Sequence, residues 1–453
     1  MENELFERVP IPKAYMKMAL PVVMGMIVTL VYNLVDTYFI ALTGNTNLIA
    51  GISICAPLFT LLLAIGDIFG IGGSSVISRI LGMHNADEAR KKSTFCFYTS
   101  MITGLIFTVV MLVMKKQVLM LLGATDKTYE YASQYYFWLI LGSTFVIFSL
   151  VPSNLLRAEG MSLESMIGSV IGTVVNIILD PIFIFTLGLG AAGAAIATVI
   201  GYIVTCTFFI YIIRKKSKAL SMDFKLLSLD AATFASVFAI GLPSSITNLM
   251  QTIGITLTNR FLQPYGDDSI AIMGIVLKIV NIALLVIVGL AFGGQPLIGY
   301  NYGARLKKRL RKIIGFGMAV TGGTGLVFLI VLSVFANGII SKFLSDSEMI
   351  RIGVSMLRWQ LLGAPLMGIC LTAIVSFQST GKASGAFILS ACRQGIVFLP
   401  VIFILSALMG FEGVLRAQFV SDIVTTVVAF VLFKAFLWKD IFGQESESAH
   451  TFG

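Results

Sequence analysis

"MSLESMIGSVIGTVVNIILDPIFIFTL", residues 161–187, is a long run of Ile, Val, Leu and Phe that holds only a few polar residues. A helix needs about 20 predominantly apolar residues to cross the hydrocarbon core of a bilayer. Backbone groups in lipid must form their hydrogen bonds within the protein, which restricts such a segment to a helix or a closed-barrel strand. The segment lacks the two-residue alternation of a barrel strand, so it is predicted to be a membrane-spanning helix.

The rest of the chain has the same character, since 57% of its 453 residues are hydrophobic and only 12% are charged. Soluble domains are far less apolar. The sequence therefore predicts an all-α integral membrane protein with 12 transmembrane helices. The expected spans are 13–41, 48–80, 93–114, 131–156, 161–187, 191–213, 232–262, 270–302, 313–336, 349–379, 383–408 and 412–438.

Neither the N-terminus nor the cysteines suggest a secreted protein. The N-terminus lacks the pattern of a cleaved signal, so the first apolar stretch is expected to be a mature helix. The five cysteines are scattered singly, and both histidines lie in polar stretches. Neither a disulfide framework nor a histidine metal site is expected.

The net charge of +9 comes from 32 Lys and Arg against 23 Asp and Glu. The basic residues concentrate in "ARKK", "RKKSKALSMDFK" and "ARLKKRLRK", which all follow even-numbered spans. Cytoplasmic loops of membrane proteins carry such an excess of Lys and Arg. Both termini are therefore expected in the cytoplasm, and no nucleic-acid partner is expected.

The chain also contains an internal repeat. "ALPVVMGMIVTLVYNLVDTYFI" (19–40) resembles "GLPSSITNLMQTIGITLTNRFL" (241–262), and "GGSSVISRILG" (72–82) resembles "GGQPLIGYNYG" (293–303). The offset stays between 220 and 222 residues. The repeat predicts two parallel six-helix lobes around a central cavity, an arrangement known in secondary transporters. We place the lobes at 1–222 and 223–453.

Four polar residues of the first lobe align with other residue types in the second, and neither carboxylate is repeated there. At the repeat offset, Asp36, Asn176, Asp180 and Thr198 align with Thr258, Ile396, Pro400 and Gln418. Asn176 and Asp180 share one helix face, and Pro181 frees the carbonyl of Ile177. Such an all-oxygen cluster suits Na⁺, and neighbouring carboxylates can also share a proton.

We therefore predict a cation site at these four residues, with Na⁺ and H⁺ both open, since acids inside a membrane are by default functional. The alternative is structural. In that case Asp180 caps a helix broken by proline, and Asp36 pairs with an arginine.

A second group of residues is expected to bind substrate along the central cavity, with methionines as adaptable walls. It comprises Tyr32, Asn33, Asp67, Met250, Gln251, Met273 and Asn281. The methionines could equally be packing residues, and Asp67 could pair with Arg79 or a lysine. Some of the charged residues inside the second-lobe spans are expected to pair with one another. These are Lys278, Arg358, Arg393, Arg416 and Asp422.

Other motifs argue against an enzyme. "SFQSTGKAS" resembles a P-loop fragment but lacks the first glycine, and Ala383 replaces the Ser/Thr. No nucleophile–base pair or metal cluster is recognisable. The sequence therefore predicts no cofactor, and transport driven by an ion gradient.

These residues resemble the MATE multidrug and toxin extrusion transporters of the MOP flippase superfamily. The resemblance covers nearly the whole chain, and its most specific part is "AEG…NIILDPIF…GAAGAAIAT". It implies two lobes around a central cavity and export of cationic lipophilic compounds in exchange for Na⁺ or H⁺. It also implies a cation site at the four residues above, and a bend of the first helix at Pro21.

The resulting hypothesis is a cation-coupled multidrug efflux antiporter in a cell (inner) membrane of the bacterial type. Expected partners are small cationic or amphiphilic drugs and membrane lipids, and the chain is expected to be a monomer. The alternative is a flippase for lipid-linked intermediates, which would use Lys278, Arg393 and Arg416 to bind phosphate.

Overall fold

The computed structural model describes residues 2–438 and 440, although the side chains of residues 2, 3, 247–249, 251, 252 and 394 lie outside the description. In this part of the chain the fold is entirely helical, which confirms the predicted all-α class. The chain forms two compact units. Unit 1 comprises Met1–Ala19, Gly82–His84 and Ile246–Gly453, and unit 2 comprises Leu20–Leu81 and Asn85–Ser245.

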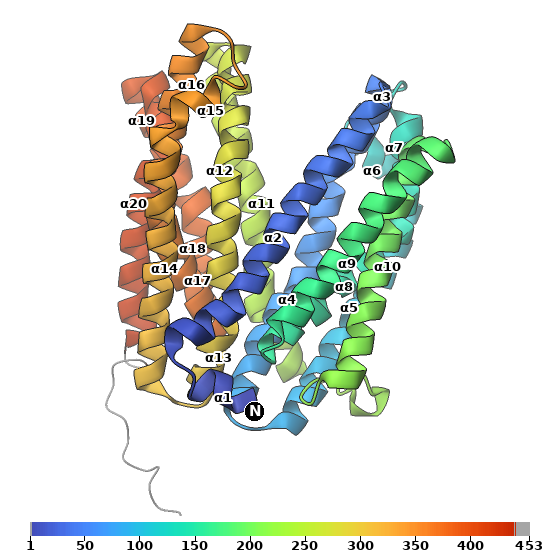
Figure 1. The fold of residues 1–453 in the computed structure, drawn as a ribbon, viewed down its shortest axis with the longest axis vertical. Helices are drawn as coiled ribbons and strands as arrows, with labels where there is room; N and C mark the ends of the chain where they lie inside the picture. The colour runs from blue at the N-terminus through green and yellow to red at the C-terminus, as the bar shows by residue number, and fades with distance from the viewer. Residues whose placement is uncertain (1, 439, 441–453) are drawn as a thin grey trace, which may run out of the picture. The chain divides into compact units, whose positions relative to one another are not determined.

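Unit 2 contains most of α2 and the helices that follow it in the first half of the chain (Figure 1). These elements are α2 (Ile11–Leu42), α3 (Thr46–Ile54), α4 (Ala56–Gly82), α5 (Ala86–Val113), α6 (Lys115–Leu121), α7 (Tyr129–Leu141), α8 (Ser143–Ala158), α9 (Ser162–Pro181), the π-helix η1 (Ile182–Thr186), α10 (Gly190–Lys216) and the 3₁₀-helix η2 (Phe224–Leu226).

Unit 1 contains the short N-terminal helix and the second half of the chain, and α11 begins in unit 2. Its elements are α1 (Glu2–Glu7), α11 (Ala231–Leu262), η3 (Gln263–Tyr265), α12 (Asp267–Gly293), α13 (Gln295–Gly303), α14 (Lys307–Val334), α15 (Ala336–Ile340), α16 (Ser347–Leu362), α17 (Ala364–Ser379), α18 (Ala383–Ala391), the π-helix η4 (Cys392–Ile396), α19 (Phe398–Met409) and α20 (Phe411–Phe436).

Each predicted span coincides with one helix or with consecutive helices. In the described residues, nine helical stretches are long and apolar enough to cross a membrane. A tenth is the pair α7–α8, which is bent by 48°. Shorter apolar helices cover Ala231–Ile246 and Phe398–Met409. Helices α1 and α6 were not predicted, because six and seven residues are too short to span a bilayer.

Exposed apolar side chains show how the helices suit lipid. Along α5, Leu105, Val109 and Val113 lie on one face and expose 55%, 62% and 77% of their surface. A row of this kind would be unfavourable in water but is ordinary against acyl chains. The exposed face therefore agrees with the transmembrane assignment.

The basic segment after α10 is held against unit 2. The buried Glu159 carboxylate accepts hydrogen bonds from the backbone N–H of Lys218 at 2.7 Å and of Ala219 at 2.9 Å. Arg90 on α5 donates to the Lys218 carbonyl at 2.9 Å. These bonds account for the place of the segment in unit 2. The division of the chain into lobes at residues 222 and 223 stays a prediction.

Candidate cation site

Asp36 and Asp180 meet in unit 2, although 143 residues separate them in the sequence. Their carboxyl groups, from α2 and α9, lie close enough to interact electrostatically. Asp180 is fully buried, and Asn176 one turn earlier is 3% exposed. The structure therefore brings the two predicted aspartates together.

Helix α10 supplies the fourth predicted residue, and it packs along α9 (Figure 1). Thr198 is buried and accepts a hydrogen bond from Asn176 Nδ2 at 3.4 Å. Its own hydroxyl donates to the Ala194 carbonyl at 2.9 Å. Asn176 and Thr198 are therefore joined by a hydrogen bond one helical turn before Asp180.

Three buried oxygens at this cluster have no hydrogen-bond partner among the described residues. They are both carboxyl oxygens of Asp180 and Oδ1 of Asn176. Buried polar atoms are almost always satisfied, and two ionised carboxylates offer only acceptors. A proton shared between the aspartates, or a bound cation, would supply the missing partner. This is the chemistry expected from the sequence.

Three tyrosines surround the cluster. Tyr32 lies beside Thr198 and interacts electrostatically with Asp36. Tyr135 on α7 interacts with both aspartates and with Tyr202 on α10. Tyr32 was predicted to bind substrate; the structure places it beside the cation cluster, and its contact with substrate stays a prediction.

Tyr135 and Tyr202 were not predicted, although the repeat contains a signal for one of them. At the offset of 220 that relates Thr198 to Gln418, Tyr202 aligns with Asp422. A carboxyl in one half therefore corresponds to a phenol in the other. Tyr135 has no such signal, because tyrosines are common in apolar helices.

The proline after Asp180 changes the helix locally. Helix α9 ends at Pro181, and the π-helix η1 continues directly from it. Proline removes one backbone donor, and π-helical turns often occur at functional sites. The wider π-helical turn begins two residues after Asp180. The backbone that follows this carboxyl group is therefore not a regular α-helix.

Close packing of α9 on α10 depends on glycines. A Cβ on Gly172 would overlap the Thr205 hydroxyl, and a Cβ on Gly201 would lie 2.7 Å from the Gly172 carbonyl and 3.2 Å from Asn176 Cβ. The absence of these side chains lets Asn176 approach Thr198.

The variant Gly172→Ala should therefore lower the free energy of unfolding by about 1–3 kcal/mol, because the added methyl group overpacks the interface. It should also weaken ion binding by separating α9 from α10. Thermal unfolding in detergent measures the first effect. Gly323→Ala on α14 is the matched control, since its Cβ would meet no atom within 4 Å. Equal melting temperatures for the two variants would contradict the prediction.

Asp67 has a different environment. Its carboxylate interacts electrostatically with Arg157 on α8. The Arg157 guanidinium also donates to Asn154 Oδ1 at 2.6 Å. Arg79, considered as a partner from the sequence, donates to the Ser75 carbonyl at 3.0 Å. The arginine that the sequence analysis missed, Arg157, is thus an electrostatic partner of Asp67 within unit 2.

The remaining predicted substrate residues do not form one group. Met273 is completely buried in the core of unit 1, so its prediction as a cavity wall is wrong and its role is packing. Asn33 is exposed on α2, and Met250 is half-buried on α11. The side chain of Gln251 lies outside the described residues. Asn281 lines a small pocket in unit 1, described next.

This pocket has a volume of about 70 Å³ and contains a buried ion pair. Arg393 Nε lies 3.3 Å from Asp422 Oδ1, and Gln418 Nε2 donates to the same oxygen at 3.0 Å. Gly363 leaves room for this carboxylate, since its Cβ would overlap Asp422 Oδ2. The prediction that second-lobe charges pair is confirmed for Arg393 and Asp422. In contrast to Asp180, Asp422 is satisfied by a cation of the chain itself.

The other charged residues of the predicted second lobe do not form buried ion pairs of this kind among the described residues. Arg416 bonds to Glu412 at 3.1 Å and stacks on the Trp359 ring at 4.8 Å. Lys278 and Arg358 are exposed and have no carboxylate within 4.0 Å among the described residues. In that same part of the chain, no three His, Cys, Asp or Glu side chains gather as a metal site.

One family model, described as MatE, matches the chain twice, at residues 21–182 and 243–404. The chain belongs to the MatE family of MATE transporters. Both ends of the second match lie 222 residues after those of the first, which agrees with the repeat found in the sequence. The two aspartates that meet, Asp36 and Asp180, both fall in the first match.

Relatives of this MATE transporter agree with the family match. It is 32% identical over 430 residues to "Multidrug export protein MepA" of Staphylococcus aureus (strain MSSA476), covering 94% of each chain. It is 33% identical to the protein of the same name from Staphylococcus haemolyticus, covering 94% of this chain and 93% of the relative. Among solved structures, an outward-facing multidrug resistance MATE transporter of the MOP superfamily superimposes with a TM-score of 0.89. It is 25% identical and the match covers 95% of this chain and 97% of that one.

Proposed function

We propose that this MATE transporter is a secondary active multidrug efflux antiporter, which exports cationic lipophilic compounds in exchange for Na⁺ or H⁺. The observation that carries the proposal is the meeting of Asp36 with the fully buried Asp180, whose oxygens have no donor among the described residues. The names of the staphylococcal relatives support drug export as the direction of transport.

The coupling ion occupies the oxygens of Asp36, Asn176, Asp180 and Thr198. Its charge, or the proton's, neutralises the two carboxyl groups and weakens their attraction for a positively charged drug. An ion can shift a conformational equilibrium only by the difference of its affinities for the two states. The site must therefore change when the drug is released, and Pro21, which lies inside α2, is our candidate for the point of change.

The orientation follows from the charges of the loops. Basic residues cluster at the start of α5, at the end of α10 and at the start of α14. We propose that these ends and both termini are cytoplasmic, in a cell membrane of the bacterial type. The ion then enters from outside and leaves to the cytoplasm, while the drug moves outward.

Dye transport in vesicles tests the proposal directly. In right-side-out proteoliposomes loaded with a fluorescent cationic dye, an inward gradient of Na⁺ or of H⁺ should accelerate efflux several-fold without ATP, because ion binding drives the change of state. Imposing the two gradients separately identifies the ion. Efflux that ignores both gradients, or that needs ATP, would rule out ion coupling.

The flippase alternative receives no support from the residues that suggested it. Arg393 is paired with Asp422, and Arg416 with Glu412. Their positive charges are therefore compensated inside the chain, which leaves Lys278 as the one member of that group without a carboxylate partner among the described residues.

A further inference from the structure

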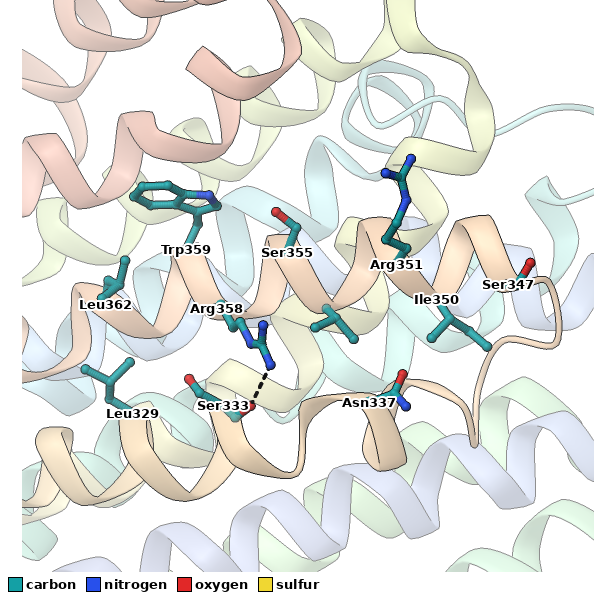
Figure 2. Close-up of a pocket in the computed structure, with 11 residues that line it drawn as sticks. Leu329, Ser333, Asn337, Ser347, Ile350, Arg351, Ser355, Arg358, Trp359 and Leu362 are labelled. Atoms are coloured by element: carbon teal, nitrogen blue, oxygen red, sulfur yellow. Dashed lines mark hydrogen bonds between the residues drawn. The ribbon is translucent and has the colours of Figure 1, made fainter.

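A groove of about 810 Å³ runs along one end of unit 1, between α14, α15 and α16 (Figure 2). Both polar and apolar side chains line it. The polar side chains include Ser333, Asn337 and Ser355, and the apolar wall includes Leu329 and Leu362. The groove is far from the cation cluster in sequence and belongs to the other unit, so the proposed transport mechanism does not use it.

Two arginines make this groove electropositive. Arg351 and Arg358 are seven residues apart on α16, about two turns, and therefore share one face of the helix. Arg351 approaches Glu348 at 3.7 Å, but both side chains are at least 74% exposed. Arg358 has no carboxylate within 4.0 Å among the described residues. The groove thus holds two positive charges and one loosely associated acid.

The Arg358 guanidinium and the Ser333 hydroxyl are hydrogen-bond donors that the described residues satisfy poorly. Its Nη2 donates to the Ser333 carbonyl at 3.4 Å, a long bond, and Figure 2 shows the guanidinium bent toward Ser333. The Ser333 hydroxyl is itself buried and has no hydrogen-bond partner in the described part of the chain. The guanidinium keeps its other N–H donors for phosphate oxygens, and Ser333 lines the same groove.

The neighbouring surface of α14 is apolar and exposed. Val327, Ile330 and Val334 expose 56–69% of their surface. The groove therefore has a cationic, hydrogen-bonding end and a lipid-like side, and both lie at the end of α14 opposite its basic N-terminus. A soluble anion would use only the polar end, whereas a phospholipid would use both.

We propose that this groove binds one anionic phospholipid, with its phosphate on Arg358 and Ser333 and an acyl chain against Leu329 and Leu362. Arg351, which extends away from α14 in Figure 2, has a long exposed side chain and contributes its charge from the same helix face. A negatively charged headgroup matches the excess of positive charge. In the proposed orientation this lipid belongs to the outer leaflet.

Native mass spectrometry of the full chain, titrated with phosphatidylglycerol or phosphatidylcholine, tests the proposal. The wild type should retain one phosphatidylglycerol in preference to phosphatidylcholine. Arg358→Gln should weaken that binding at least about tenfold, because it removes a charge-assisted hydrogen bond to the phosphate. Arg260→Gln is the matched control, since Arg260 is an exposed arginine near the end of α11 that does not line the groove.

Three outcomes would overturn the proposal. The first is equal lipid retention by wild type and Arg358→Gln, and the second is equal retention of the two lipids by the wild type. The third is displacement of the lipid by millimolar glycerol phosphate, which would show that a soluble anion suffices. If Arg358→Gln does not fold, Arg351→Gln, which alters an 80% exposed side chain, should still weaken binding while Arg358→Lys preserves it.

Discussion

Asp36→Asn and Asp180→Asn should each reduce ion-driven dye efflux to the level of empty vesicles. An asparagine keeps the volume of the side chain but carries neither the negative charge that holds Na⁺ nor the exchangeable proton. Because the two carboxyl groups are neighbours that interact electrostatically, losing one removes half of the charge at the site. Efflux rates under imposed Na⁺ and pH gradients measure the effect.

Folding and coupling can be separated in the same variants. Asp180 is fully buried with unsatisfied oxygens, so its neutral amide should leave the melting temperature unchanged or higher. Binding of the dye should persist. Asp268→Asn is the matched control, since this exposed carboxylate lies at the start of α12. If both variants transport as fast as the control, the cation site is elsewhere.

Replacing Arg393 by Leu should lower the free energy of unfolding by about 3–5 kcal/mol, because it leaves the Asp422 carboxylate buried without its charge partner. Asp422 is 4% exposed in its side chain and would keep only the hydrogen bond from Gln418. The double variant Arg393→Leu, Asp422→Leu should recover most of the loss, since a buried ion pair is often replaceable by apolar residues.

A second ion pair of unit 1 supplies the control. Arg416 and Glu412 are 34% and 48% exposed in their side chains, and solvent-exposed pairs contribute about 0–1 kcal/mol. Arg416→Leu should therefore be much milder than Arg393→Leu. Detergent or SDS unfolding of the four proteins measures the series. Equal losses of unfolding free energy for Arg393→Leu and Arg416→Leu would show that burial of the Arg393–Asp422 pair does not make it more important for stability.

The comparison of the two halves shows how far sequence reasoning extended into the site. Asp36 and Asp180 stood out because their aligned partners carry no carboxyl, and both lie where the structure forms the cluster. Met273 misled the same reasoning, because a methionine in an apolar helix is equally suited to a cavity wall and to a core. Its complete burial in unit 1 depends on which helices pack against α12, and periodicity does not contain that information.

The sequence by itself determined the apolar helical segments and the repeat, because the length of an apolar run and the position of a proline act locally along the chain. Only the tertiary structure decided which polar groups meet. Asp36 reaches Asp180 and Asp422 reaches Arg393 through helix packing that glycines such as Gly172 and Gly363 permit. Such contacts depend on interlocking side chains from several helices, and for this reason Tyr135 joined the cation cluster without any signal in its own segment.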